Sequence, residues 1–374
     1  MTQKILYVLA ETGDFWSSRL PLALAAQARG CEIHLAAPGA SSDSKLKAQG
    51  FTGHDLPLMQ NGFSPLSALK TIFALRKILQ DLNPDLVHTI TLKYSLLTGI
   101  AMRGMRGLKT VYTIAGLGYL FSGHDLKSKI MLCLAAPFLK HVLRNPDAVV
   151  TFQNSDDMNI LVRKNFVAEE NCVLIPGSGV DIEKFSPRAG TDNSLPPLVL
   201  MPTRLVRDKG VSVFIEMAKI LEKRQIPARF QVAGGVTDHN PLAISKEEMQ
   251  RMVAGTPVEW IGRVDDMPAL YAQAALIAYP SWYREGIPRV LLEAAAMGKA
   301  CVTTDHPGCR EAVAHNENGL LVPVKDAEAT ADAVEKILTD SALQKKMEIS
   351  ARARAEREFA TAHIVEKTIK IYRL

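Results

Sequence analysis

The sequence predicts an α/β protein with two doubly wound domains, each built on a parallel sheet, and three observations support this prediction. Short apolar runs alternate with amphipathic helical patterns along the whole chain, which is typical of strand–helix–strand units. Residues 176–197 are rich in Gly, Pro, Ser and Asp, lack sustained periodicity and separate two such series. The length of 374 residues, of which 47% are hydrophobic and 22% charged, suits two domains with separate cores and excludes a disordered chain.

The apolar runs give the order of the predicted strands. In the first domain they cover residues 4–10, 31–36, 85–88, 109–114 and 147–152, and helical patterns such as 18–29 and 65–81 separate them. In the second domain they cover residues 198–201, 229–233, 258–261, 276–279 and 300–303, and the pattern is almost entirely helical from residue 326 onward. We therefore expect an N-terminal domain at residues 1–185, a C-terminal domain at residues 186–360, and a helix at residues 361–374 that packs back on the N-terminal domain.

Cysteine usage and hydropathy indicate a cytoplasmic protein. The five cysteines are odd in number and scattered, and they form no C-x-x-C pair, which argues against a disulfide framework and a zinc site. The apolar run near the N-terminus covers only residues 5–10, too short for the core of a signal peptide. No uninterrupted apolar stretch reaches the roughly 18 residues of a membrane span.

The net charge of +5 comes entirely from the first half of the chain. Residues 1–190 contain 20 Lys and Arg against 15 Asp and Glu, whereas residues 191–374 contain 24 of each. Between residues 60 and 144 the bias is steeper, with 11 basic residues against 3 acidic ones. Either this excess is a solvated basic face, or it meets an anionic partner, namely a phosphate-bearing substrate, a membrane surface or nucleic acid.

Strand-to-helix loops are where a doubly wound sheet binds ligands, outside the carboxyl ends of its strands. Gly13 lies in the first such loop, ahead of a helix predicted to open near Ser17, where backbone amides and a helix N-terminus favour an anion. The loop contains neither G-x-G-x-x-G nor a P-loop motif, so it supports neither a dinucleotide fold nor a P-loop nucleotidase.

Two cations stand at the next candidate loop, RLVRDKG (204–210). Arg204 follows the strand predicted at residues 198–201, and Lys209 precedes a helix whose dipole also favours negative charge. The pair suits a diphosphate, although ordinary surface charges would give the same spacing.

The segment EGIPRVLLE (285–293) provides two carboxylates around a helix start. Pro288 is predicted at the first helical position, and the amides of Gly286 and Ile287 would form an anion cradle with Glu285 at its mouth. Glu293 lies on an otherwise apolar helix, where a carboxylate is costly to bury unless it has a partner. Carboxylates accept hydrogen bonds well from vicinal sugar hydroxyls.

Taken together these motifs resemble glycosyltransferase family 4, whose members are retaining enzymes of the GT-B fold, with two Rossmann-like domains facing a cleft. The resemblance covers the linker IPGSGVDIEKFSP (175–187), the pair in RLVRDKG (204–210) and the long block of residues 260–313. It implies that Arg204 and Lys209 bind the diphosphate of a nucleotide sugar and that Glu285 contacts its sugar. The remaining donor contacts implied are Gly13, Gly262, Arg263, Val264, Gly286, Ile287, Pro288 and Glu293.

One departure from the family pattern concerns the segment after the fifth strand of the N-terminal domain. Many members carry a histidine where this chain has Ala115, so the role of that histidine cannot be assigned to any residue at this position. The segment AGLGYLF (115–121) resembles instead a subgroup that extends polyprenyl-diphosphate-linked saccharides in bacterial surface polysaccharide synthesis or protein glycosylation. His88 and His124 lie elsewhere in the same domain, where a single histidine is commonly structural.

The implied chemistry needs no metal. Departure of a nucleoside diphosphate requires stabilisation of an anion, which Arg204, Lys209 and the helix start near Pro288 can supply, and no D-x-D triplet occurs among the motifs. Retention could use Glu285 as a nucleophile, as in two-carboxylate glycosidases. The family instead implies attack on the same face of the sugar, with Glu285 orienting it.

The sequence contains no clear motif for binding the acceptor. Residues 63–79 and 126–144 mix lysines and arginines with long apolar faces, so each is either a helix at an anionic membrane surface or an ordinary sheet-covering helix. A lipid-linked acceptor favours the membrane, and binding through Lys127, Lys129 and Lys140 would be lost at high salt. The candidates for acceptor or membrane contact are Arg19, His88, Gly116, Gly118, Lys127 and Lys129.

Two other classes of function remain as alternatives. A non-catalytic two-lobed sugar-binding protein would have no use for the complete set of Arg204, Lys209, Glu285 and Glu293. A nucleic-acid-binding protein would be expected to carry aromatic RNP-type motifs or a Lys/Arg-rich block, and neither occurs. We therefore expect transfer of a hexose or N-acetylhexosamine from a UDP-linked sugar to a polyprenyl-diphosphate-linked saccharide, without a cofactor.

Overall fold

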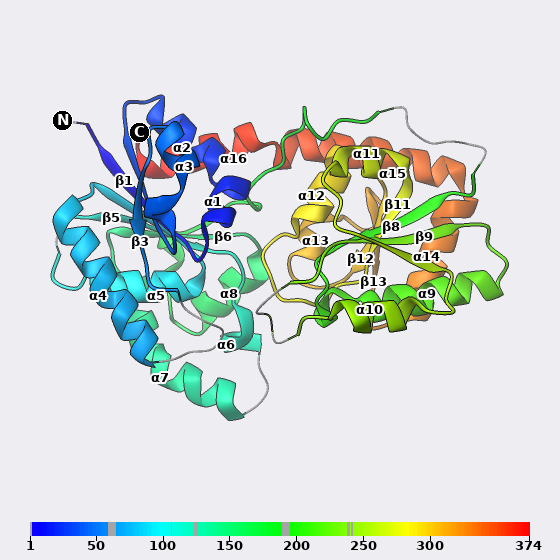
Figure 1. Cartoon of the computed structure of the whole chain (residues 1–374), viewed down its shortest axis with the longest axis horizontal. Helices are drawn as coiled ribbons and strands as arrows, with labels where there is room; N and C mark the ends of the chain where they lie inside the picture. Colours follow the sequence, from blue (N-terminus) through cyan, green and yellow to red (C-terminus); the bar gives the residue numbers. More distant parts are fainter. Residues whose placement is uncertain are drawn as a thin grey trace. The chain divides into compact units, whose positions relative to one another are not determined.

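The computed structural model describes residues 2–58, 65–105, 107–122, 126–188, 195–237, 240 and 242–374, and it divides into two compact units (Figure 1). Unit 1 comprises Met1–Ser178, Arg284–Gly286 and Ala362–Leu374, and unit 2 comprises Gly179–Tyr283 and Ile287–Thr361. Each unit contains one parallel sheet. The prediction of two doubly wound α/β domains is confirmed.

The sheet of unit 1 has seven strands in the order β3-β2-β1-β4-β5-β6-β7. They are β1 (Lys4–Val8), β2 (Glu32–Ala37), β3 (Thr52–Asp55), β4 (Leu86–Ile90), β5 (Lys109–Ile114), β6 (Ala148–Phe152) and β7 (Cys172–Leu174). Its helices are α1 (Thr12–Ser18), α2 (Leu20–Gln27), α3 (Ser44–Ala48), α4 (Pro65–Leu82), α5 (Leu92–Ala101), α6 (Gly118–Ser122), α7 (Leu126–Leu143), α8 (Ser155–Arg163) and α16 (Thr361–Tyr372).

Both faces of this sheet are buried because successive side chains of each strand point to opposite sides. On β1, Ile5 and Tyr7 pack with α2 and α16, whereas Leu6 and Val8 pack with α4 and α5. Figure 1 shows helices on both sides of the sheet accordingly.

The sheet of unit 2 has six strands in the order β10-β9-β8-β11-β12-β13. They are β8 (Leu198–Pro202), β9 (Arg229–Ala233), β10 (Val258–Gly262), β11 (Ala274–Tyr279), β12 (Cys301–Thr304) and β13 (Gly319–Val322). The helices are α9 (Val211–Lys223), α10 (Lys246–Val253), α11 (Met267–Gln273), α12 (Arg289–Ala296), α13 (Cys309–Ala312), α14 (Ala327–Thr339) and α15 (Ser341–Arg354). On β8, Val199 and Met201 face α9 and α14, and Leu198 and Leu200 face the core beside α12.

The sequence pattern did not predict three of the strands, β3, β7 and β13. β3 has the sequence TGHD, with no apolar run, and it is fastened instead by pairing with β2 and by hydrogen bonds from Ser41 to Asp55. β7 and β13 are short strands at sheet edges. Their sequences, CVL and GLLV, are apolar, but runs of three and four residues are too short to identify a strand by periodicity.

The predicted linker is partly fixed to unit 2. Val180 forms a bridge with Ala360, and Arg352 Nη1 donates to the carbonyls of Ile182 and Phe185 at 3.1 and 3.0 Å. These backbone contacts need no repeating side-chain pattern, which explains why the sequence there reads as irregular.

A buried polar network joins the C-terminal helix α16 to the sheet of unit 1. His88 on β4 is 1% exposed, and its Nε2 lies 2.7 Å from Thr113 Oγ1 while its Nδ1 contacts the hydroxyl of Tyr372. Burial, and then the nearby Arg19 cation, hold the pKa of His88 well below its ordinary value, so the ring is neutral.

We expect Tyr372→Phe to lower the free energy of unfolding by about 1–3 kcal/mol, because His88 Nδ1 would lose its partner inside the core. Urea denaturation monitored by circular dichroism measures the change. Tyr94→Phe is the matched control, since Tyr94 is also buried but its hydroxyl makes no hydrogen bond to the described residues. Equal stability of the Tyr372→Phe variant and the wild type would show that this bond does not hold α16 in place.

Candidate functional site

Both sheets reverse their strand order at a single point, and the predicted site residues follow the strands there. In unit 1 the reversal lies between β1 and β4, and in unit 2 between β8 and β11. Ligands of doubly wound sheets bind outside the carboxyl ends of the strands at such a point. The segments that carry Arg204, Lys209 and residues 280–288 follow β8 and β11 directly.

Lys209 lies in a 3₁₀ turn between β8 and α9, and its side chain is held by aromatic rings. The residue is 3% exposed, and its Nζ lies 4.7 Å from the ring centre of Tyr283 and 5.6 Å from that of Tyr279. Cation–π contacts of this kind stabilise a lysine side chain that is largely removed from water. The turn therefore holds a positive charge in a fixed position at the start of α9.

Two contacts lock the loop of Lys209 to the loop after β11. Gly210 has φ +89°, and a Cβ there would lie 2.1 Å from the carbonyl oxygen of Pro280, so only glycine fits. The indole Nε1 of Trp282 donates to Asp208 Oδ1 at 3.0 Å, and the Trp282 amide donates to the Asp208 carbonyl at 2.9 Å. The loops after the two central strands of unit 2 thus form one rigid piece.

Arg204 differs from Lys209 in its surroundings. It follows β8 directly and is exposed, and it forms no ion pair with any residue that the structure describes. Its neighbour Arg207, by contrast, is paired with Glu248 at 2.7 Å. Arg204 is therefore the cation of this loop that is available to an anion from solution.

Glu293 on α12 is partly buried, with a 14% exposed side chain, and has two partners. The hydroxyl of Tyr271 donates to Oε2 at 3.2 Å, and Arg289 Nη2 donates to Oε1 at 3.4 Å. Burial raises the pKa of Glu293 above its ordinary value, although the Arg289 charge opposes the shift. Tyr271 and Arg289 thus provide the partners that a partly buried carboxylate on an apolar helix requires.

The start of α12 is one residue later than predicted. The helix begins at Arg289, and Pro288 is its N-cap residue, with φ −60° and ψ 122°. The extended ψ of Pro288 explains the difference, because the proline ring fixes φ but leaves ψ to the chain. Ile287 and Pro288 are buried at this helix start.

The loop after β10 is largely exposed. Gly262 ends the strand, and Arg263 has an 85% exposed side chain that lies 3.6 Å from Asp265. Val264 is partly buried against the core of unit 2. These three predicted residues therefore lie at the carboxyl end of β10, an edge strand of the sheet.

The segment Arg284–Gly286 belongs to unit 1, where it packs on the turn after β5. The Gly286 amide donates to the Ala115 carbonyl at 3.1 Å. Gly116 has φ +110°, and a Cβ there would lie 2.9 Å from Glu285 Cα, so a side chain would collide with the backbone of Glu285. The sequence pointed to Ala115 and Gly116 through a departure from the family pattern, and the structure brings them against Glu285.

A buried ion pair that the sequence gave no sign of holds this segment. Asp157 on α8 is fully buried, and Arg284 donates to its Oδ1 from Nη2 at 3.0 Å and from Nε at 3.3 Å. Asn154 Nδ2 donates to the other carboxylate oxygen at 3.1 Å. The two charged residues are 127 positions apart in the chain, too far for any periodicity to reveal.

The first loop of unit 1 differs from the prediction. α1 begins at Thr12 rather than near Ser17, so exposed Gly13 lies in the first turn of a helix and not in a loop. The helix starts early because Glu11 is extended and Gly13 needs no left-handed conformation. Arg19 lies between α1 and α2 and is 7% exposed, and its buried Nε has no hydrogen-bond partner among the described residues.

The other acceptor candidates are spread over unit 1. His88 is part of the core network described above, which favours a structural role for it. Gly118 is exposed at the start of α6, and Lys129 is exposed on α7. The side chain of Lys127 and all of His124 lie outside the described residues.

Thr91 is a candidate that sequence reasoning missed. It follows β4 at the reversal point of unit 1 and has φ +77° and ψ 148°, a conformation that is rare for a β-branched residue. Its amide donates to the Thr113 carbonyl at 2.9 Å. Strain of this kind concentrates at functional sites, and a threonine in a strand-to-helix loop carries no sequence signal for it.

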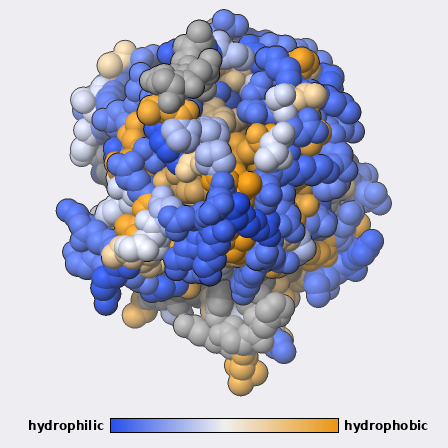
Figure 2. Space-filling view, turned by 90° about the vertical axis from the view of Figure 1, so that its right-hand side faces the viewer, coloured by the Kyte–Doolittle hydropathy of each residue, from blue (hydrophilic) through white to orange (hydrophobic). Residues whose placement is uncertain are grey.

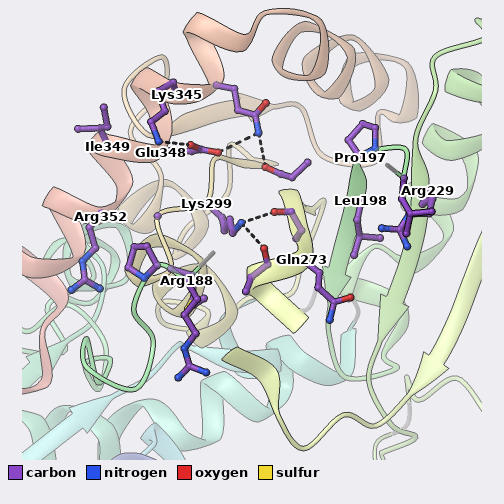
Figure 3. Close-up of a pocket in the computed structure, with 18 of the residues that line it drawn as sticks. Arg188, Pro197, Leu198, Arg229, Gln273, Lys299, Lys345, Glu348, Ile349 and Arg352 are labelled. Carbon is purple, nitrogen blue, oxygen red and sulfur yellow. Dashed lines mark hydrogen bonds and ion pairs between the residues drawn. The ribbon is translucent and has the colours of Figure 1, made fainter. Parts of the chain in front are cut away.

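A cavity of about 1210 Å³ in unit 2 lies at the opposite, amino end of the sheet. Leu198, Arg229 and Ala274, each at the start of a strand, line it, and none of the predicted site residues does. Figure 3 shows Lys299 at its centre, where Nζ donates to the carbonyls of Ala272 and Ala274 at 3.1 and 2.7 Å. Lys299 thus satisfies the backbone at the end of α11, and the cavity stands apart from the candidate site.

The part of the chain that the structure describes contains no group of three or more His, Cys, Asp or Glu side chains placed to hold a metal ion.

Two family models match the chain. Residues 183–354 match the model described as glycosyl transferases group 1, and residues 4–154 match that of glycosyl transferase 4-like proteins. A crystal structure of Anabaena Alr3699/HepE in complex with UDP superimposes with a TM-score of 0.77 at 18% identity, covering 99% of this chain and 100% of that one.

Two relatives of the chain act on lipid-linked sugars, according to their names. One is the N,N'-diacetylbacillosaminyl-diphospho-undecaprenol alpha-1,3-N-acetylgalactosaminyltransferase of Campylobacter jejuni, 25% identical over 95% of this chain and 94% of the relative. The other is the UDP-Gal:alpha-D-GlcNAc-diphosphoundecaprenol alpha-1,3-galactosyltransferase of Escherichia coli, 25% identical over 77% of this chain and 75% of the relative.

We expect Asp157→Asn to destabilise unit 1 by about 3–5 kcal/mol, because it leaves the Arg284 guanidinium without its buried counter-charge. Chemical denaturation measures the loss. Asp156→Asn, on the same turn of α8 but only half-buried, is the control and should cost less than about 1 kcal/mol. If the two variants are equally stable, the pair does not hold the Glu285 segment.

Proposed function

The chain belongs to the glycosyl transferases group 1, with a glycosyl transferase 4-like N-terminal region, and we propose that it moves a hexose or N-acetylhexosamine from a UDP-linked sugar to a polyprenyl-diphosphate-linked saccharide. The observation that carries this proposal is the pair of cations, buried Lys209 and exposed Arg204, at the strand-order reversal of unit 2. The names of the Campylobacter and Escherichia relatives support the lipid-linked acceptor. The UDP bound to the Anabaena protein supports the nucleotide.

The departing group determines what the enzyme must stabilise. As the bond between the anomeric carbon and the diphosphate oxygen breaks, negative charge develops on the diphosphate and positive charge on the sugar ring. Lys209, fixed by Tyr279 and Tyr283, and Arg204 beside it would neutralise the diphosphate. Because Lys209 is already fixed in place before the charge develops, its stabilisation is preorganised, and we propose that the reaction needs no metal ion.

We propose that the reaction retains the anomeric configuration of the sugar without a double displacement. A double displacement would need a second carboxyl group about 5 Å from Glu285 as acid and base. Asp157 is occupied by Arg284, and Glu293 by Tyr271 and Arg289. We therefore assign Glu285 to orienting the sugar, while the acceptor oxygen bonds to the anomeric carbon on the face that the diphosphate leaves and the acceptor proton passes to the departing diphosphate.

Glu293 is assigned to the ribose of the nucleotide. Tyr271 and Arg289 fix its carboxylate in one orientation, which suits bidentate acceptance from two vicinal hydroxyls. The exposed loop Gly262–Val264 would lie beside the base, and the helix start at Ile287–Pro288 beside the diphosphate.

A lipid-linked acceptor places the reaction at a membrane, and we propose that the enzyme works in the cytoplasm at the inner face of the cell membrane. None of the helices in the described part of the chain is long and apolar enough to cross a bilayer.

The proposal is tested by incubating the purified protein with UDP-, GDP- and ADP-sugars and a polyprenyl-diphosphate saccharide, and measuring release of nucleoside diphosphate. We expect acceptor-dependent release from a UDP-sugar. Binding of nucleotide sugars without release under any condition would identify a non-catalytic binding protein instead.

We expect Glu285→Gln to abolish transfer while leaving UDP binding within about twofold of the wild type, because this carboxylate contacts the sugar and not the leaving group. Turnover is measured by UDP release and binding by calorimetry. Glu222→Gln, an exposed glutamate on α9, is the control and should be fully active. Wild-type turnover in Glu285→Gln would refute the assignment.

Arg204→Ala and Lys209→Met should each weaken UDP binding by about one to two decades, since a charge-assisted hydrogen bond contributes roughly 1.5–3 kcal/mol. Binding of uridine should change far less, because uridine carries no phosphate. Arg207→Ala removes a cation of the same turn that is already paired with Glu248 and is the control. Equal losses for uridine and UDP would mean that Arg204 and Lys209 support the fold and not the diphosphate.

A further inference from the structure

Gln153 lies next to the segment of Glu285 and has no role in the proposed reaction. It occupies the connection between β6, which ends at Phe152, and α8, which begins at Ser155. In a doubly wound sheet such a connection lies at the carboxyl edge, where ligands bind. The side chains of Gln153 and Glu285 are both partly exposed, so a ligand at this edge has access to each of them.

The carboxamide of Gln153 lies against Gly286, the residue that follows Glu285. A Cβ at Gly286 would lie 1.8 Å from Gln153 Oε1 and 2.6 Å from its Cδ, so a side chain there would displace the carboxamide. The Gly286 amide is bonded in turn to the Ala115 carbonyl at 3.1 Å. Gln153 Nε2 lies farther from this glycine than Oε1 does. Glycine at position 286 therefore keeps the Gln153 side chain beside Glu285.

The backbone is fixed on both sides of Gln153. Before it, the carbonyl of Phe152 accepts from the Ile175 amide at 2.8 Å. After it, Asn154 is the N-cap of α8, and its Oδ1 accepts from the Asp157 amide at 2.7 Å. Gln153 is thus the one residue between a strand hydrogen bond and a helix cap. A side chain on such a backbone binds a ligand at a small cost in conformational entropy.

Three other polar side chains near Glu285, those of Asn154, Asp157 and Arg284, are bonded to one another. Their hydrogen bonds hold the segment, so these groups are not the ones to meet a sugar. A carboxamide has two N–H donors and two acceptor lone pairs. Gln153 can therefore bond to the protein and to a ligand at the same time.

Exposure alone would not distinguish a glutamine from the rest of the surface. Most of the face shown in Figure 2 is hydrophilic, and its hydrophobic residues form small separate patches. Polar side chains on a surface of this kind are usual and need no ligand to explain them. Gln153 differs from them because it lies beside Glu285, the carboxylate to which the transferred sugar is assigned.

We propose that Gln153 is a second side chain that contacts the transferred sugar, with Nε2 donating to a hydroxyl next to the one that Glu285 accepts from. This assignment rests on the proposed function. A carboxylate can only accept, whereas each sugar hydroxyl both donates and accepts, so a donor beside Glu285 completes the set of hydrogen bonds. An acceptor and a donor that hold two neighbouring hydroxyls fix the sugar in one orientation, as transfer to an acceptor on one face requires.

Binding of UDP-sugars in the absence of acceptor tests this contact separately from transfer. The wild type is titrated by calorimetry with UDP-glucose, UDP-galactose and their N-acetylhexosamine counterparts, and the tightest ligand is then compared with its monodeoxy analogues. Gln153→Ala should bind that UDP-sugar about three- to tenfold more weakly, because a hydrogen bond between neutral groups is lost. UDP alone should bind equally well to the variant and the wild type.

The deoxy analogues identify the hydroxyl that Gln153 contacts. For the analogue that lacks this hydroxyl, Gln153→Ala and the wild type should bind equally, whereas the other analogues should keep the three- to tenfold difference. Gln153→Met, which retains the length of the side chain without its polar atoms, should behave as Gln153→Ala does. Gln80→Ala, at an exposed glutamine on α4, is the matched control and should bind every ligand as the wild type does.

Two results would overturn the assignment of Gln153 while leaving the proposed function intact. One is equal binding of the UDP-sugar by the wild type and both Gln153 variants. The other is the same loss for every analogue and for UDP, which would make Gln153 a support of the fold. A wild type that binds no UDP-sugar would instead contradict the proposed function, and the assignment of Gln153 with it.

Discussion

The buried pair of Asp157 and Arg284 is the constraint on which the proposed reaction centre depends. A fully buried carboxylate is costly unless every oxygen is bonded, and here Arg284 and Asn154 provide those bonds. Arg284 is covalently next to Glu285, so anchoring one fixes the backbone of the other. Gly116 allows the turn after β5 to lie close to Glu285, because any side chain at position 116 would collide with the backbone of Glu285.

In unit 2, close contacts between two backbone segments fix the turn that carries Lys209. Gly210 lets the turn of Lys209 touch Pro280, and Asp208 accepts from both the backbone and the indole of Trp282. A cation that must meet a developing negative charge contributes most when it need not reorganise. The aromatic rings around Lys209 and these loop contacts provide that rigidity at the carboxyl ends of β8 and β11.

Local patterns in the sequence predicted most strands of the two sheets and the loops that carry the candidate cations, glycines and glutamates. Interactions between distant residues were not accessible, which is why the Arg284–Asp157 pair, the strained Thr91 and the edge strands β3, β7 and β13 appeared only in the structure. The helix α7 shows a third limit. α7 is apolar on more than one side, so periodicity reveals its helix but not that Ile130 and Leu134 face outward while Leu139 and Leu143 are buried.

The stereochemistry of the product tests the central claim most directly, because it depends on how the sugar lies between its leaving group and the acceptor. The wild-type enzyme is given an α-linked UDP-sugar and a polyprenyl-diphosphate saccharide, and the new glycosidic bond is examined by proton NMR for its anomeric coupling constant. Attack on the face that UDP leaves, with Glu285 orienting the sugar, predicts an α-linked product. A β-linked product would contradict the account, since it requires attack from the opposite face.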